Sequence, residues 1–158
     1  VHSRRLMLAT TMGLAALTNV FLMAMLVLAA LGSEPRFYLS DGEWRALEWL
    51  REEVGRGQVV LCAPETGMFV PAWAGQRVVY GHPFETVNAE RREAQVEAFW
   101  AGEMTAPERD TFLRENRVGY VLVGPRELAL GAGELGSRGA GDLVFETDDV
   151  RVYRVNGR

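Results

Sequence analysis

The sequence predicts an α/β protein in which an N-terminal transmembrane helix precedes a small Rossmann-like three-layer domain with a mostly parallel sheet. One observation behind this prediction is an uncharged apolar stretch from Leu6 to Leu31. Another is the alternation of short apolar runs with amphipathic helical segments after it, which is typical of parallel sheets with crossover helices. The last two runs are separated only by Asp148-Asp149 and predict a C-terminal antiparallel hairpin.

The apolar stretch is long enough to cross a bilayer. A helix over its 26 residues would be about 39 Å long, against roughly 30 Å of hydrocarbon. A cleaved signal peptide is the alternative, because Ala30-Leu31-Gly32 offers a small-x-small site. The apolar region of a signal peptide is usually about 7–15 residues, however. We therefore expect residues 1–33 to be a transmembrane helix that spans at about 6–31.

Charge predicts the orientation of this anchor. Arg4 and Arg5 precede it with no acidic residue beside them, whereas Glu34 and Arg36 on the far side cancel. The positive-inside rule then places the N-terminus in the cytoplasm and residues 34–158 outside, as an extracytoplasmic α/β domain. The predicted location is the cell membrane, with the lipid bilayer as a partner.

Caps and turns set the expected elements of the domain. Ser40 with Glu43, and Thr105 with Glu108, form capping boxes at two helix starts. Asn88 is expected to cap a third helix. The expected helices cover residues 41–55, 65–74, 89–103 and 105–117, with a helical turn at 125–130. The expected strands cover residues 58–63, 77–80, 118–123, 142–147 and 150–155.

Composition argues against several function classes. Residues 34–158 carry 15 basic and 21 acidic side chains, a net charge of −6, which argues against nucleic-acid binding. The single cysteine, Cys62, lies in an apolar run and predicts a buried, inert thiol without any internal disulfide. His82 is the only histidine after the anchor, so we expect no metal site.

The motif Gly131-Ala132-Gly133-Glu134-Leu135-Gly136 is a literal GxGxxG. A dinucleotide site needs this motif directly after a strand and at the start of a helix. Here a helical turn precedes it and only the hairpin follows, so we expect a flexible loop and no cofactor. A Ser-His-Asp triad would have to combine His82 with Ser137 of the same loop. No catalytic residue is predicted.

Polar residues follow the three central strands, where open parallel sheets bind their ligands. Carboxylates, an imidazole and a guanidinium there could hold a sugar, a phosphate or a peptide segment. The alternative is a self-satisfied network of ion pairs and caps, for example with Arg126 between Glu65 and Glu85. The candidate ligand-binding residues are Glu65, His82, Glu85, Thr86, Arg126 and Glu127.

Four tryptophans could form a platform on which sugars stack. They are Trp44, Trp49, Trp73 and Trp100. Three of the four fit apolar helix faces, so core packing is the preferred interpretation.

The chain resembles the C-terminal end of large bacterial GT-C glycosyltransferases, the mannosyltransferase and oligosaccharyltransferase-like group. The resemblance covers nearly the whole chain, from the apolar helix to Val152-Tyr153-Arg154-Val155. Its most specific parts are Gly81-His82-x-x-Glu85-Thr86 and the segment Tyr120 to Glu127. It implies a last membrane helix followed by a terminal extracytoplasmic domain, and it fits Val1 being a cut end.

In that family the acidic catalytic residues lie in a loop between the first transmembrane helices, and the donor is usually a polyprenyl-phosphate sugar. No part of this sequence matches that loop, so no catalytic role is carried over. The expected function is a non-catalytic accessory domain that positions the acceptor or stabilises the membrane part. Its partners would be further transmembrane helices and a glycan or lipid-linked sugar. The alternative is a free-standing single-pass protein whose domain binds a small ligand or a protein partner.

Overall fold

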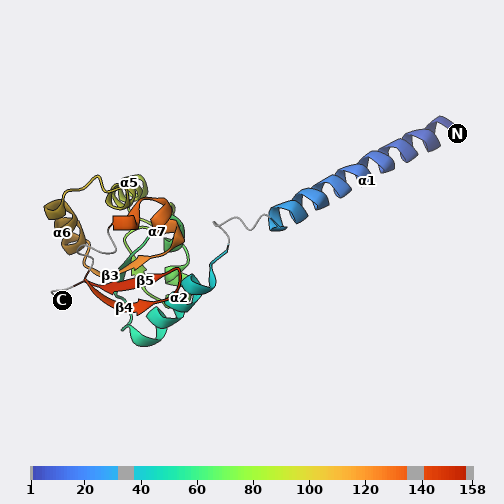
Figure 1. Cartoon of the computed structure of the whole chain (residues 1–158). Helices are drawn as coiled ribbons and strands as arrows, with labels where there is room; N and C mark the ends of the chain where they lie inside the picture. The colour runs from blue at the N-terminus through green and yellow to red at the C-terminus, as the bar shows by residue number, and fades with distance from the viewer. Residues whose placement is uncertain (1, 32–37, 135–140, 156–158) are drawn as a thin grey trace. The chain divides into compact units, whose positions relative to one another are not determined.

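The computed structural model describes residues 2–31, 38–134 and 141–155 of the chain. These residues divide into two units, Val1–Tyr38 and Leu39–Arg158. Figure 1 shows the chain, and each unit is described here by itself.

The first unit is the helix α1 (His2–Leu31). Its stretch Ser3–Ala29 has 27 residues with a mean hydropathy of 2.1, and none of it is buried. That exposure distinguishes α1 from the core helix of a soluble protein. Its length and composition suit either a membrane anchor or a signal sequence.

The polar side chains within the apolar part of α1 are satisfied inside the helix. Thr10, Thr11, Thr18 and Asn19 each donate a hydrogen bond to the backbone carbonyl four residues earlier, at 2.8–3.0 Å. A polar group that is already hydrogen-bonded costs less to place in hydrocarbon than one without a partner. The four residues therefore do not prevent α1 from crossing a membrane.

The second unit contains a mixed sheet with the strand order β2-β1-β3-β5-β4. β1 pairs in parallel with both β2 and β3, whereas β5 is antiparallel to both β3 and β4. The α/β class and the C-terminal hairpin are confirmed, while the Rossmann-like label stays a prediction. The strands are β1 (Val59–Leu61), β2 (Arg77–Val78), β3 (Val118–Val123), β4 (Asp142–Glu146) and β5 (Arg151–Arg154).

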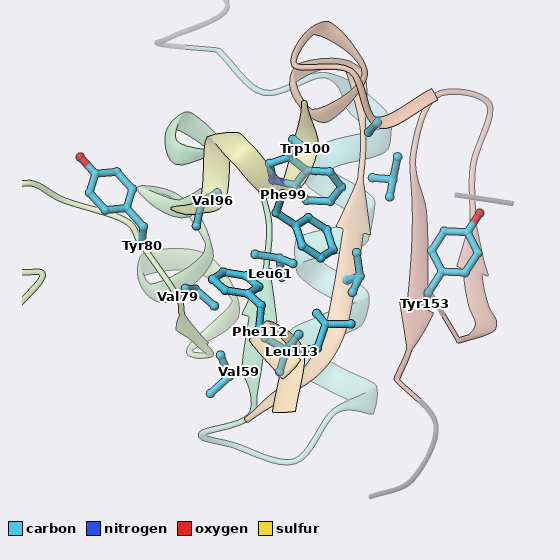
Figure 2. Packing of buried hydrophobic residues seen from close by; sticks show 14 residues of the cluster. Val59, Leu61, Val79, Tyr80, Val96, Phe99, Trp100, Phe112, Leu113 and Tyr153 are labelled. Atoms are coloured by element: carbon cyan, nitrogen blue, oxygen red, sulfur yellow. The ribbon is translucent and has the colours of Figure 1, made fainter. Parts of the chain in front are cut away.

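Helices cover both faces of this sheet. Val59 and Leu61 of β1 face a cluster with α5 (Ala89–Trp100) and α6 (Ala106–Glu115). Val60, between them, faces a second cluster with α2 (Asp41–Glu53) and α4 (Val70–Ala74), as the alternation of strand side chains requires. Figure 2 shows Phe99 and Phe112 next to Leu61 in the first cluster.

An irregularity in β3 keeps its side chains in register with these two layers. Val59 pairs with Val118, but Val60 pairs with Tyr120, so Gly119 is an extra residue on β3. Val118 and Val121 therefore both join the cluster under α5 and α6 although they are three residues apart. A bulge of this kind shifts the alternation by one residue.

The predicted side-chain caps are confirmed at two helix starts and wrong at a third, although α5 does begin at Ala89 as predicted. The backbone N–H groups of Ser40 and Thr105 donate to Glu43 and Glu108, at 2.7 and 2.8 Å, as capping boxes do. Asn88, by contrast, has a positive φ of 55° and makes no side-chain cap. An N-cap residue usually has an extended backbone, which brings its side chain to the first free N–H groups.

The helix expected over residues 65–74 is divided in two. α3 (Pro64–Gly67) ends before α4 begins, and Pro71 lies in the first turn of α4. Proline has no N–H to continue the earlier helix but suits a helix start. The expected turn at residues 125–130 is the short helix α7 (Pro125–Ala129).

Two further motifs can be compared with the structure. Cys62 is buried and free, and burial raises the pKa of its thiol well above the ordinary value, which fits an inert thiol. In the GxGxxG motif, Ala132–Glu134 form a 3-10 turn, and its last two residues lie outside the described part of the chain.

Candidate functional site

Five of the six residues predicted from the sequence divide between two places. Arg126 and Glu127, on α7, are buried, with 8% and 0% of their surfaces exposed. His82, Glu85 and Thr86 follow β2 and line an open groove. The sixth, Glu65 of α3, is half-buried and does not line that groove.

The carboxylate of Glu127 joins the ends of two parallel strands. Its Oε1 accepts hydrogen bonds from the Ala63 N–H at 2.7 Å and from the Thr66 hydroxyl at 2.8 Å, just after β1. Its Oε2 accepts from the Gly124 N–H at 2.8 Å, just after β3. Three donors thus surround one buried carboxylate, which compensates for its removal from water.

Arg126 connects the same region to α2. Its guanidinium forms an ion pair with Glu43, which is also buried, and lies 5.4 Å from the ring centre of Phe69. From the sequence, an ion-pair network with Arg126 between Glu65 and Glu85 was one of the expectations. Its partner is instead a residue 83 positions earlier in the chain.

These contacts occupy the position where an open α/β sheet usually offers a ligand site. The chain leaves β1 toward β2 on one side, while β3 lies on the other. A crevice is expected where the strand order reverses in this way, outside the carboxyl ends of the strands. Here the Glu127 carboxylate lies between those ends and bonds both. The geometry therefore supports the structural interpretation for Glu127 and Arg126.

The groove along the edge strand β2 is the larger open feature. It has a volume of about 1040 Å³, just above the range of roughly 300–1,000 Å³ that is usual for small-molecule sites. Its walls come from α3, α4, the segment after β2, α5 and the end of α6. Its polar lining residues are Gln76, Arg77, His82, Glu85, Thr86, Arg92, Glu115, Asn116 and Arg117.

Three guanidinium groups give this groove its chemistry. Arg77, Arg92 and Arg117 line it together with two carboxylates, of Glu85 and Glu115. Arg92 donates a hydrogen bond to the side-chain oxygen of Asn116. Among the described residues, no ion pair joins Arg77 or Arg117 to a carboxylate. Free guanidinium groups suit phosphate and carboxylate ligands.

Sequence reasoning missed these arginines because it considered only the carboxyl ends of the strands. Arg77 begins β2 and Arg117 immediately precedes β3. Both lie beside Val59 of β1, at the end of the sheet where the parallel strands start, opposite to their carboxyl ends. The signal that could have found them is that parallel strands also start at a common edge. Arg117 has a positive φ of 54°, a conformation that only the folded structure reveals.

The geometry offers no metal site within the described residues, where no three histidine, cysteine or acidic side chains gather. The guanidinium groups of the groove suit an anionic or polar ligand.

The class of protein defined by these features is a mixed α/β domain, helical on both sheet faces, that follows a long apolar helix. No protein-family model and no curated protein matches the chain.

A solved structure does match. It is the C-terminal globular domain of an oligosaccharyltransferase from Archaeoglobus fulgidus, with a TM-score of 0.55 and 14% sequence identity. The match covers 76% of this chain and 100% of that domain. At this identity the similarity establishes a shared fold, and the fold is the one that the GT-C resemblance of the sequence implies.

We predict that Glu127→Gln destabilises the domain by about 1–3 kcal/mol, because an amide replaces one acceptor oxygen with a donor among N–H and O–H groups. Denaturant titration of the full chain in detergent, followed by tryptophan fluorescence, measures the change. Glu65→Gln is the matched control on the same edge of the sheet. An effect of Glu65→Gln as large as that of Glu127→Gln would contradict the assignment.

The Glu127 carboxyl also predicts a pH dependence. Burial raises its pKa above the ordinary value of 4.5, against the opposing effect of its hydrogen bonds. The folded state therefore keeps this proton to a higher pH than the unfolded chain. The stability linked to it is present below pH 4.5 and is lost as the pH rises through the raised pKa. Above pH 4.5 the unfolding free energy should fall more steeply in the wild type than in Glu127→Gln, and equal slopes would contradict this.

Proposed function

We propose that the chain is a membrane-anchored accessory domain of a GT-C glycosyltransferase-like protein, non-catalytic by itself. Residues 1–33 would be the anchor and residues 34–158 the extracytoplasmic domain, which positions the acceptor or stabilises the membrane part. The observation that carries this proposal is the fold similarity to the archaeal oligosaccharyltransferase domain, combined with the apolar helix α1. In such a protein the transfer from a polyprenyl-phosphate sugar would take place elsewhere.

The ligand-binding role proposed for the six residues is best supported at His82, Glu85 and Thr86. These three line the groove, whereas the polar atoms of Glu127 bond the protein itself. The neighbouring guanidinium groups favour an anionic ligand. We therefore propose that the ligand of this groove is the phosphate of a lipid-linked sugar or an acidic segment of the acceptor.

The alternative proposal is a free-standing single-pass protein whose domain binds a small ligand or a protein partner at the same groove. The mass of the native polypeptide distinguishes the two. A much larger chain with further hydrophobic spans supports the accessory domain, and a polypeptide of about this length supports the alternative. Turnover of a sugar donor by the chain alone would contradict both.

The orientation can be tested by thiol labelling, because the native Cys62 is buried and stays silent in the folded state. We expect a membrane-impermeant maleimide to label Glu90→Cys, an exposed position on α5, in intact cells. Ser3→Cys, before the span, should react only after permeabilisation. The reverse pattern would place the domain in the cytoplasm. Release of the domain with α1 removed would identify a signal peptide.

The groove can be tested with a polyprenyl-phosphate sugar as the probe. We expect the double variant Arg77→Gln/Arg117→Gln to raise Kd roughly tenfold or more, because charge-assisted hydrogen bonds of about 1.5–3 kcal/mol are lost. Titration of the full chain in detergent measures this. Arg91→Gln, an exposed residue next to Arg92 that does not line the groove, is the control. Equal affinity in all three proteins would contradict the site.

A further inference from the structure

Exposed large apolar side chains gather at one edge of the domain. The described part of residues 39–158 has seven exposed large apolar side chains. Six of them lie on segments that follow a parallel strand or on the helices beside these segments. The seventh, Leu143, is on β4. We call the six the apolar edge: Trp44 (39% exposed), Met68 (38%), Trp73 (49%), Phe84 (92%), Val87 (81%) and Leu128 (50%).

The topology explains why these residues share an edge. β1, β2 and β3 are parallel, so the segments that follow them, which carry Met68, Phe84 and Leu128, begin at the same end of the sheet. The Glu43–Arg126 ion pair fixes the start of α2 next to α7 at this end (Figure 1).

The two tryptophans extend the same surface. Trp44 lies in the first turn of α2, and its ring meets that of Trp73 edge-on, with centroids 5.0 Å apart.

The contacts that these side chains make within the domain leave much of their surface exposed to water. Phe84 projects from the segment after β2, and the ring contact found for it is with His82, at 5.5 Å. Apolar groups of this size are ordinarily removed from water, at about 25 cal/mol per Å² of buried surface. Tryptophan and other aromatic rings are enriched where proteins meet the membrane–water boundary.

The covalent chain indicates which surface covers this edge. Leu39 begins the domain and packs against the cluster under α2. Only residues 32–38 separate it from the end of α1 at Leu31. Even fully extended, this connection spans about 28 Å. If α1 crosses a bilayer, the edge from which the chain enters the domain is held close to that bilayer.

We propose that the apolar edge lies in the membrane interface, with Trp44, Trp73 and Phe84 among the lipid headgroups. The proposal rests on the membrane anchor of the proposed function. The exposed charges beside these side chains, among them Asp41, Arg45 and Glu85, form no basic cluster, so zwitterionic lipid suffices as the partner. The groove shares Met68 and Val87 with this edge, so part of its lining adjoins the surface that we place at the lipid.

Tryptophan fluorescence can test this directly, because all four tryptophans lie after the anchor, at positions 44, 49, 73 and 100. The full chain is reconstituted in phosphatidylcholine vesicles with or without bromine on the acyl chains near the headgroup. Bromine quenches tryptophans that touch the lipid. We expect a loss of up to about half of the emission, since two of the four tryptophans are on the apolar edge.

The variants locate the effect. Trp44→Phe/Trp73→Phe should abolish most of the quenching, whereas Trp49→Phe should retain it, because Trp49 packs against Phe145 at 5.5 Å. Phe84→Ser/Val87→Ser changes only exposed side chains, so it preserves folding, and it should reduce quenching by weakening the contact with lipid.

Flotation of the vesicles tests the membrane anchor separately from the membrane contact of the apolar edge. If the chain floats with the vesicles but bromine leaves its emission unchanged, the membrane-facing edge is wrong and the anchor stands. If the chain does not float, both are wrong. Quenching that survives Trp44→Phe/Trp73→Phe would also overturn the proposal.

Discussion

The buried carboxylate of Glu127 is the interaction on which the arrangement of the domain depends. It bonds backbone N–H groups at the ends of both β1 and β3, so one side chain fixes the relative position of the two central strands. The adjacent Arg126 extends this connection to α2 through Glu43. Both side chains come from α7, a helix of five residues. A short helix with few apolar contacts of its own is thus held in place by polar bonds at both of its faces.

The contacts of Glu127 and Arg126 together limit the space that is left for a ligand. In many open α/β sheets the crevice between diverging strands holds the ligand, and backbone N–H groups donate to it. In this domain a protein carboxylate accepts those hydrogen bonds, so the space available to a ligand is displaced to the edge strand β2. β2 is only two residues long, which leaves room for the groove between α4 and the end of α6.

The sequence predicted most elements because their signals are local. Capping boxes, prolines and the alternation of apolar runs located α2, α6, β3 and the hairpin, and Cys62 was correctly expected to be buried. The partner of Arg126 was not predictable, because Glu43 had already been explained as part of a capping box. A carboxylate with two oxygens serves both roles, one oxygen accepting from Ser40 and the other from Arg126. The arginines that line the groove are brought together by the order of the strands in the sheet. Local sequence patterns do not predict that order. Trp44 and Trp73 fit apolar helix faces in the sequence and were expected to pack in the core, yet 39% and 49% of their surfaces are exposed.

A tethered domain needs little affinity for a surface beside its anchor. If α1 anchors the chain as proposed, the short connection after it makes contact of the domain with the membrane an intramolecular event, and tethers of this length give effective concentrations in the millimolar range. Six partly exposed side chains bind lipid too weakly to recruit a free domain for long, since even a single myristoyl chain gives only marginal membrane binding. In the arrangement that we propose, the same six would orient a domain that its anchor already holds nearby. A modest apolar edge is thus what a pre-anchored domain requires, and a larger one would add to the risk of aggregation before insertion.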